Sequence, residues 1–245
     1  MTPNADPNRG ETDNEQDVGS GHDGERDEET DDRRAEREGL VARLLDRGRI
    51  EREETAAALR AVPRHAFVPP ARREAAYDDR PLPIGADQTI SAPHMVGWMT
   101  DLVVLEPDDR VLEIGTGCGY HAAVTAELAG EVKSVEYHAS LAEAARDRLA
   151  ELGYENVAVR VGDGHEGLPE RAPYDAAYLT CGVSAVPDSV TEQLRPDGRI
   201  VAPIETDSVL GRGGQTLVRA TKRPDGSLDC EHHGSVRFVR MRGSS

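Results

Sequence analysis

The hydrophobic residues along the chain follow two spacings, which separate a helical N-terminal part from a region of alternating strands and helices. Between residues 40 and 62, apolar side chains recur every three or four positions, which predicts helices around 40–45 and over 51–62. A further helix is expected to begin at Pro93, because proline suits the first helical turn. From residue 110 onward, short apolar runs alternate with helical patterns.

This alternation predicts an α/β fold with a doubly wound, mostly parallel sheet. The expected strands cover residues 110–114, 131–136, 157–161, 174–180 and 199–204, with helices between them over 121–128 and 141–149. The helical signal ends after residue 205, and two more strands are expected over 215–221 and 235–239.

The first 34 residues differ in composition from the rest of the chain. They consist mainly of Asp, Glu, Gly, Asn and Thr, and such a segment buries too little apolar surface to offset the entropy lost on ordering. We therefore expect a disordered acidic tail over 1–34 and one domain over 35–245. Within that domain we expect an N-terminal helical segment at 35–109, a core at 110–205 and C-terminal strands at 206–245.

The chain is strongly acidic, with a formal net charge of −17. Lysine occurs only as Lys133 and Lys222, and aromatic residues make up 4% of the sequence. Acidic, lysine-poor proteins are typical of concentrated salt, which screens the repulsion between like charges. The composition therefore indicates a halophile, similar to haloarchaeal proteins, and it disfavours binding to the phosphate backbone of nucleic acids.

Several classes of protein lack support in the sequence. No apolar run approaches the ~20 residues of a membrane span, and the N-terminus has no secretory signal pattern. The three cysteines form no C-x-x-C pair, and the eight histidines form no metal-ligand motif. We therefore expect a cytoplasmic monomer with no bound metal and no membrane or nucleic-acid partner.

The most informative motif is the segment Val111–Tyr120, which reads V-L-E-I-G-T-G-C-G-Y. An apolar strand enters a loop with glycine at every second position, and a helical pattern follows at once. Glycine allows tight turns and lets a ligand approach the backbone closely, and the N-terminus of a helix favours anionic ligand groups. The pattern predicts a nucleotide-binding turn, although a strand-to-helix turn without a ligand is the simpler alternative.

An acid at the end of the next expected strand supports the nucleotide-binding interpretation. Glu136 follows the glycine loop by roughly 20 residues, the spacing at which an acid reaches the ribose hydroxyls in dinucleotide-binding folds. A later strand ends at Gly162-Asp163-Gly164, where Asp163 is by itself also a common turn residue.

The segment Glu113–Gly119 resembles motif I of the class I S-adenosylmethionine methyltransferases, E/D-x-G-x-G-x-G. Upstream, the chain resembles the protein-L-isoaspartate O-methyltransferases, which carry V-P-R-H-x-F-V-P, A-Y-x-D-x-P-L-P-I-G and Q-T-I-S-x-P before the glycine loop. These patterns occur at Val62–Pro69, Ala76–Gly85 and Gln88–Pro93. The likeness covers essentially everything after the acidic tail.

The resemblance implies an enzyme that uses S-adenosylmethionine to methylate the α-carboxylate of L-isoaspartyl or D-aspartyl residues in damaged proteins. Ser91 is the implied catalytic hydrogen-bond donor, although a serine just ahead of Pro93 is also a favoured helix cap. The implied substrate-binding residues are Asp87, Gln88, Thr89 and Ile90. The implied cofactor-binding residues are Glu113, Gly115, Thr116, Gly117, Gly119, Glu136, Asp163, Gly164 and Thr180, with Asp163 accepting from the adenine amino group.

Two departures leave other acceptors open. Asp87 stands where many members of the family have glycine, and Thr180-Cys181-Gly182 replaces a frequent T-A-A segment. The alternatives are a methyltransferase with another carboxylate or small-molecule acceptor, and a non-catalytic S-adenosylmethionine-binding module. A Thr-Cys nucleophile of the cytosine-C5 RNA methyltransferase type lacks the electropositive surroundings that a reactive thiolate needs.

Overall fold

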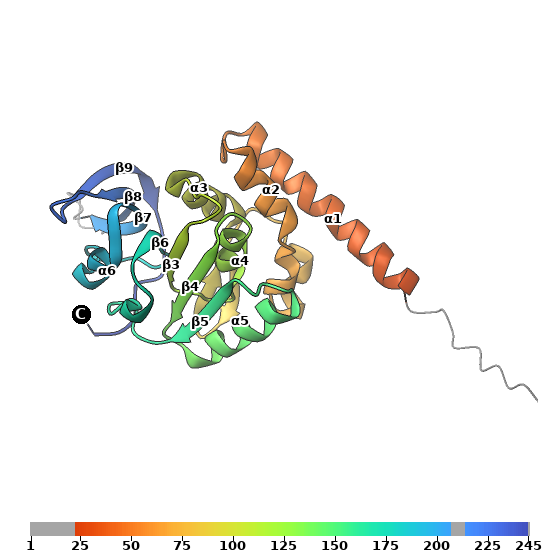
Figure 1. Cartoon of the computed structure of the whole chain (residues 1–245). Coiled ribbons are helices and arrows are strands. Elements are labelled where there is room, and N and C mark those ends of the chain that lie inside the picture. Colours follow the sequence, from red (N-terminus) through yellow and green to blue (C-terminus); the bar gives the residue numbers. More distant parts are fainter. Residues whose placement is uncertain (1–22, 207–213, 245) are drawn as a thin grey trace, which may run out of the picture.

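The computed structural model describes residues 23–206 and 214–244, with side chains from residue 33 onward. Its centre is a seven-stranded sheet in the order β5-β4-β3-β6-β7-β8-β9 (Figure 1). The strands are β3 (Arg110–Ile114), β4 (Glu131–Glu136), β5 (Val157–Val161), β6 (Tyr174–Leu179), β7 (Leu194–Thr206), β8 (Gly214–Lys222) and β9 (Leu228–Val236).

The strand order confirms the expected doubly wound sheet. The five strands from β5 to β7 are parallel, and the chain first builds outward from β3 to β5 before β6 returns to the other side of β3. In open α/β sheets of this kind, ligands bind beyond the carboxyl ends of the strands where the order reverses. The segments that follow β3, β4 and β6 therefore meet at one place.

Helices cover both faces of the sheet (Figure 1). They are α3 (Pro93–Val103), α4 (Tyr120–Ala126), α5 (Ala139–Glu151) and α6 (Asp188–Gln193). Alternate residues of a strand face opposite sides. Accordingly, Val111 and Tyr178 pack in one core cluster with Met99 of α3, while Leu112 and Leu179 pack in the cluster that holds Val190 of α6.

The N-terminal segment forms helices α1 (Asp23–Asp46) and α2 (Glu53–Ala61), two short 3-10 helices, η1 (Arg64–Phe67) and η2 (Pro70–Ala75), and the hairpin of β1 (Leu82–Gly85) and β2 (Gln88–Ile90). The helix beginning at Asp23 corrects the expected boundary, since residues 23–34 are helical in the structure. Charged pairs such as Arg34 with Glu38, 3.1 Å apart, support a helix beyond its apolar stripe. The rest of the expected tail, residues 1–22, lies outside the described residues.

The C-terminal strands extend the same sheet, because β8 pairs antiparallel with β7 and β9 antiparallel with β8. The prediction of a strand over 235–239 was wrong in its bounds, since β9 runs from Leu228 to Val236. The chain then leaves the sheet and passes Gly182, which it contacts through two backbone hydrogen bonds to Val239 and Met241. The sequence also predicts a glycine-rich loop over 211–214, ahead of β8, and residues 211–213 of it lie outside the described residues.

Candidate functional site

The loop between β3 and α4 depends on three glycines with positive φ angles, but each for a different reason. Gly115 has φ 99°, and a Cβ there would lie 2.4 Å from Oγ1 of Thr180. Gly117 has φ 55° and borders the pocket. Gly119 has φ 90°, and a Cβ there would press against Leu149 of α5. Gly115 thus leaves room for Thr180, Gly117 has a backbone conformation that favours glycine at the edge of the pocket, and Gly119 allows close packing against α5.

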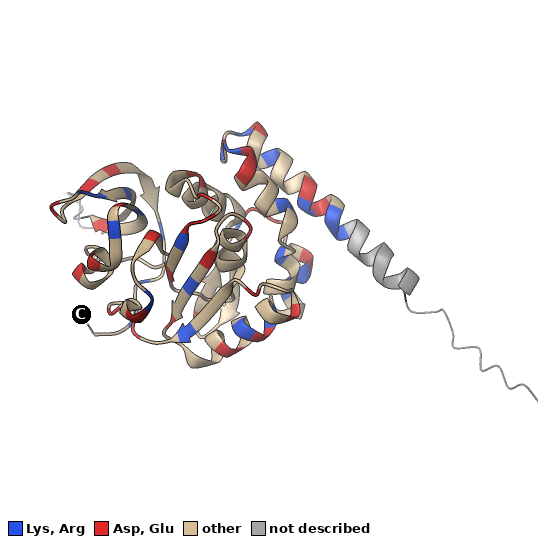
Figure 2. Cartoon of the chain, in the orientation of Figure 1, with Lys and Arg blue, Asp and Glu red and all other residues tan. Residues whose placement is uncertain are grey.

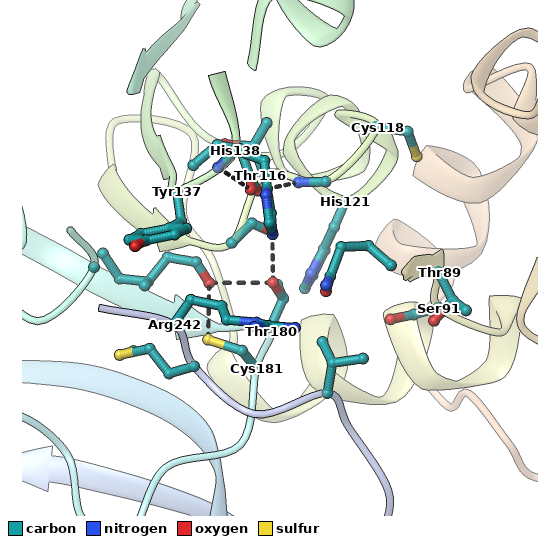
Figure 3. A pocket seen from close by; sticks show the side chains of 18 of the residues that line it. Thr89, Ser91, Thr116, Cys118, His121, Tyr137, His138, Thr180, Cys181 and Arg242 are labelled. Atoms are coloured by element: carbon teal, nitrogen blue, oxygen red, sulfur yellow. Dashed lines mark hydrogen bonds between the residues drawn. The ribbon is translucent and has the colours of Figure 1, made fainter. Parts of the chain in front are cut away.

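A pocket opens at the point where the strand order reverses, with about 780 Å³ of free space including its mouth. It is lined by the glycine loop, the end of β4, the segment after β6, the Gln88–Ser91 segment and the C-terminal residues 239–242. Figure 3 shows Thr89 and Ser91 together on one side of this pocket, Thr180 and Cys181 on another, and His121 between them. The topology thus joins segments that are far apart in the sequence.

Glu136 lies where an acid for ribose hydroxyls is expected. It lines the pocket, and its two carboxylate oxygens each accept a backbone N–H, from Gly117 and from His138, at 2.9 Å. These bonds fix the carboxylate against the glycine loop. Each oxygen keeps a further lone pair, which can accept a hydroxyl.

Thr180 closes the loop from the β6 side. Its hydroxyl lies 2.5 Å from the carbonyl oxygen of Gly115 and 3.1 Å from that of Ile114, so it satisfies the backbone at the strand end. The neighbouring Cys181 is buried, and burial raises the pKa of its thiol to about 12. A thiol with such a pKa stays protonated at neutral pH, which argues against a cysteine nucleophile at this position.

Glu113 does not line the pocket, although the sequence placed it among the cofactor-binding residues. It is fully buried beneath the loop, where it accepts a hydrogen bond from Ser134 at 2.5 Å. The Ser134 hydroxyl lies 2.5 Å from that of Thr116, which does line the pocket. On the other side, Nδ1 of His121 lies 3.8 Å from Glu113. Glu113 therefore supports the loop from behind.

Burial raises the pKa of Glu113 to about 8, and repulsion from Glu136 adds to this effect. Burial also lowers the pKa of His121 to about 3, so the imidazole is neutral. At neutral pH the Glu113 carboxyl is thus mainly protonated. A neutral acid is what a site without a cationic partner accommodates.

We expect the stability of the protein to depend on the protonation of Glu113. Its folded pKa lies above that of an exposed glutamate, ~4.3, so its favourable contribution is complete below that value and is lost as the pH rises through about 8. The variant Glu113→Gln keeps a neutral group at every pH. Denaturant unfolding at several pH values should therefore show the variant gaining stability relative to wild type as the pH rises. A constant difference would mean that Glu113 does not titrate in this range.

Asp163, the expected acceptor for adenine, is held by two backbone donors in the structure. It is not among the residues that line the pocket, although Gly164 is. Its carboxylate accepts the backbone N–H groups of His165 at 2.9 Å and of Ser244 at 2.8 Å. Burial alone would raise the pKa of Asp163, but these hydrogen bonds outweigh it and the pKa lies below its ordinary value. The C-terminal residues thus contact the expected adenine acceptor.

One wall of the pocket is formed by β2 and the residue after it, the segment in which substrate-binding residues are expected. Gln88, Thr89, Ile90 and Ser91 line the pocket, whereas Asp87, with φ 55° at the turn, does not. The Ser91 hydroxyl is not a helix cap, because Ala92 is the N-cap residue of α3 and no side chain caps it. The structure therefore leaves the Ser91 hydroxyl available to the pocket.

Sequence reasoning missed part of the lining. Tyr120, His121, Tyr137 and His138 border the pocket, as do residues 239–242. The first four adjoin predicted motifs, so their proximity could have been inferred from the strand ends. Nothing in the C-terminal sequence indicated that it returns to the glycine loop. Among residues 23–206 and 214–244, no three His, Cys, Asp or Glu side chains are placed to hold a metal ion, and none of the helices is long and apolar enough to cross a membrane.

Comparison with known proteins assigns this architecture to a family. Residues 35–245 match the family described as protein-L-isoaspartate(D-aspartate) O-methyltransferase. The chain is 50% identical over 210 residues to protein-L-isoaspartate O-methyltransferase 2 of Archaeoglobus fulgidus, covering 84% of this chain and 93% of that protein. It is 47% identical over 214 residues to the Methanopyrus kandleri protein-L-isoaspartate O-methyltransferase, covering 86% and 92% of the two chains.

Solved structures show the same fold. A protein-L-isoaspartate O-methyltransferase structure with 34% identity superimposes with a TM-score of 0.75, covering 84% of this chain and 66% of the other. A Plasmodium falciparum structure in complex with S-adenosyl-L-homocysteine has a TM-score of 0.74 and 23% identity, covering 84% of this chain and 98% of the other.

Proposed function

Because the chain belongs to the protein-L-isoaspartate(D-aspartate) O-methyltransferase family, we infer that it transfers a methyl group from S-adenosylmethionine to the α-carboxylate of isoaspartyl residues in damaged proteins. One observation carries this conclusion beyond the family match. The Gln88–Ser91 segment and the glycine loop, which are separate in the sequence, line the same pocket. This shared pocket supports a methyl-donor site next to an acceptor site.

The reaction depends on the relative positions of the methyl donor and the acceptor carboxylate more than on acid or base catalysis. An α-carboxylate with a pKa near ~4 is already ionised at neutral pH. S-adenosylmethionine supplies an electrophilic methyl group on its sulfonium. The protein therefore has to hold one carboxylate oxygen in line with that methyl group and exclude competing water. The neutral His121 and the protonated Cys181 thiol fit a site in which no side chain needs to accept a proton.

The proposed roles of the residues follow from their places around the pocket. The Ser91 hydroxyl donates to one oxygen of the acceptor carboxylate, with Thr89 beside it, and Gln88 and Ile90 contact the acceptor backbone. Glu136 accepts the ribose hydroxyls, and Gly115, Thr116, Gly117, Gly164 and Thr180 shape the donor site. Asp163 accepts a hydrogen bond from the adenine amino group, which takes the place of the backbone N–H of Ser244. Glu113 supports the loop from the protein interior, and Gly119 allows the loop to pack closely against α5.

Once formed, the methyl ester is a better electrophile than the free carboxylate. The neighbouring backbone nitrogen displaces methanol and closes a succinimide, which hydrolyses partly to normal aspartate. This sequence makes the enzyme a repair catalyst. Formation of the succinimide needs no further residue of the protein.

A comparison of two peptides tests the proposed function. An isoaspartyl peptide and its aspartyl twin, with the same residues, are incubated with labelled S-adenosylmethionine in molar potassium chloride. We expect methyl ester only on the isoaspartyl peptide, with methanol released as the ester decays. Equal labelling of both peptides would indicate another carboxylate acceptor, whereas cofactor binding without turnover would indicate a binding module.

We also propose that the protein works at high salt inside the cell, which its acidic composition supports. The same composition disfavours nucleic-acid partners, and we propose that the enzyme acts as a cytoplasmic monomer. Figure 2 shows acidic residues distributed over the helices, with basic residues among them. We expect the melting temperature to rise from ~0.1 M to ~1 M potassium chloride, as the Debye length shortens from about 10 to about 3 Å. The measurement is a thermal melt at several salt concentrations. A flat dependence contradicts salt adaptation.

A further inference from the structure

Arg64 is one of the largest fully buried side chains among the described residues. Asp79 attracts its guanidinium electrostatically, but the direct hydrogen bonds of the guanidinium go elsewhere. Its guanidinium instead donates to three backbone carbonyl oxygens. Nε donates to Ala76 at 2.8 Å, Nη2 to Arg80 at 3.2 Å, and Nη1 to Ser91 at 2.8 Å. Burying a cation without a carboxylate in direct contact is costly. The placement of Arg64 therefore indicates that its hydrogen bonds to the three carbonyl groups are needed in the folded protein.

The three acceptors enclose the segment that forms one wall of the pocket. Ala76 and Arg80 precede β1, and Ser91 follows β2 directly. The guanidinium therefore joins the two ends of the β1–β2 hairpin at its base. A second tie exists at the same place, because Asp79 accepts the backbone N–H of His94 in the first turn of α3 at 2.9 Å.

The guanidinium also contacts the cofactor side. It lies over the ring of Tyr120, 5.1 Å from the ring centroid, a distance at which cation–π attraction acts. Tyr120 follows the last glycine of the loop and lines the pocket. Its ring in turn packs edge-on against Phe67, with the centroids 5.6 Å apart. One side chain thus spans the acceptor segment and the donor loop.

We propose that Arg64 is a positioning residue for methyl transfer, which sets the place of the Ser91 hydroxyl relative to the glycine loop by binding the Ser91 carbonyl while stacking on Tyr120. The proposal rests on the role of Ser91 in the proposed function. Ser91 uses its carbonyl for Arg64 and its side chain for the pocket, so a shift of the carbonyl moves the hydroxyl. Arg64 reaches the three carbonyls from three separate nitrogens, whereas the three donors of a lysine ammonium share one nitrogen and do not match this spacing.

The test is a double-mutant cycle of Arg64→Lys and Ser91→Ala, assayed with an isoaspartyl peptide at high salt. A displacement on the order of 1 Å costs up to about 100-fold in rate. We expect Arg64→Lys to lower kcat by about ten- to 100-fold, while the dissociation constant and stoichiometry of S-adenosylmethionine stay near those of wild type. In the Ser91→Ala background the same change should cost little, because residues that act as a unit are not additive.

Losses that multiply in the cycle would overturn the proposal, since Arg64 would then act independently of Ser91. An unchanged kcat in Arg64→Lys would also overturn it. A reduced number of cofactor sites per chain would mean that the variant is partly unfolded. If Arg64→Lys does not fold, Arg64→Gln carries the same cycle, because a neutral amide removes the cost of a buried charge. Tyr77→Phe serves as the matched control, as it removes a hydrogen bond to His65 in the same region without touching Ser91. Equal methylation of the isoaspartyl and aspartyl peptides by the wild-type protein would instead reject the proposed function.

Discussion

Replacing Gly115 by valine is expected to abolish binding of S-adenosylmethionine. The backbone at Gly115 has φ 99°, which a β-branched residue rarely adopts, and a Cβ there would lie 2.4 Å from Oγ1 of Thr180. To relieve the clash, either the loop or Thr180 has to move, and both line the pocket. Isothermal titration at cofactor concentrations that saturate wild type should give no heat of binding.

Gly153→Val is the matched control for this prediction. Gly153 also has a positive φ, 81°, but a Cβ there meets nothing within 4 Å, and it follows α5 away from the pocket. We expect this variant to lose thermal stability through backbone strain and to keep its cofactor affinity. A folded Gly115→Val protein with wild-type affinity would remove the glycine loop from the proposed donor site.

Ser91→Ala is expected to reduce catalytic efficiency with isoaspartyl peptides by about ten- to 150-fold. The variant removes one hydrogen bond to a charged carboxylate, which is worth roughly 1.5–3 kcal/mol, and ~1.36 kcal/mol corresponds to a factor of ten. The affinity for S-adenosylmethionine should remain close to wild type, because Ser91 lies on the acceptor side of the pocket. Steady-state kinetics and titration measure the two quantities separately.

Thr89→Val separates the two neighbouring hydroxyls that Figure 3 shows on the acceptor side. If Ser91 is the donor, Thr89→Val costs less than Ser91→Ala in catalytic efficiency. The reverse order would transfer the donor role to Thr89. Full activity in both variants would leave the backbone N–H groups as the only donors and would contradict the assignment of Ser91.

The local sequence determined much of the fold, because strand and helix periods depend on neighbouring residues alone. The apolar runs at 110–114, 131–136 and 157–161 form β3, β4 and β5 with the same bounds. Pro93 begins α3 as expected. The first helix starts earlier than its apolar pattern predicts, since α1 begins at Asp23, ahead of the first apolar residues of the pattern.

The motifs by themselves also identify ten of the 23 residues that line the pocket. The glycine spacing and the acid at the end of β4 are what a nucleotide-binding turn requires, so Gly115, Gly117 and Glu136 are recognisable from the sequence. What a motif does not contain is the direction in which each side chain points. Glu113 belongs to the motif, yet the alternation of β3 turns it into the protein interior under the loop.

Only the tertiary structure decided which distant segments meet. The C-terminal residues 239–242 line the pocket and Ser244 contacts Asp163, although no local pattern connects them to the glycine loop. Likewise, nothing in the residues around Arg64 distinguishes it from an exposed charge, and only the fold places its guanidinium against three carbonyls and the ring of Tyr120. The physical reason is that these contacts depend on two things. One is the order of the strands in the sheet, and the other is which distant backbone groups still need a hydrogen-bond partner. Residue spacing carries no information about either.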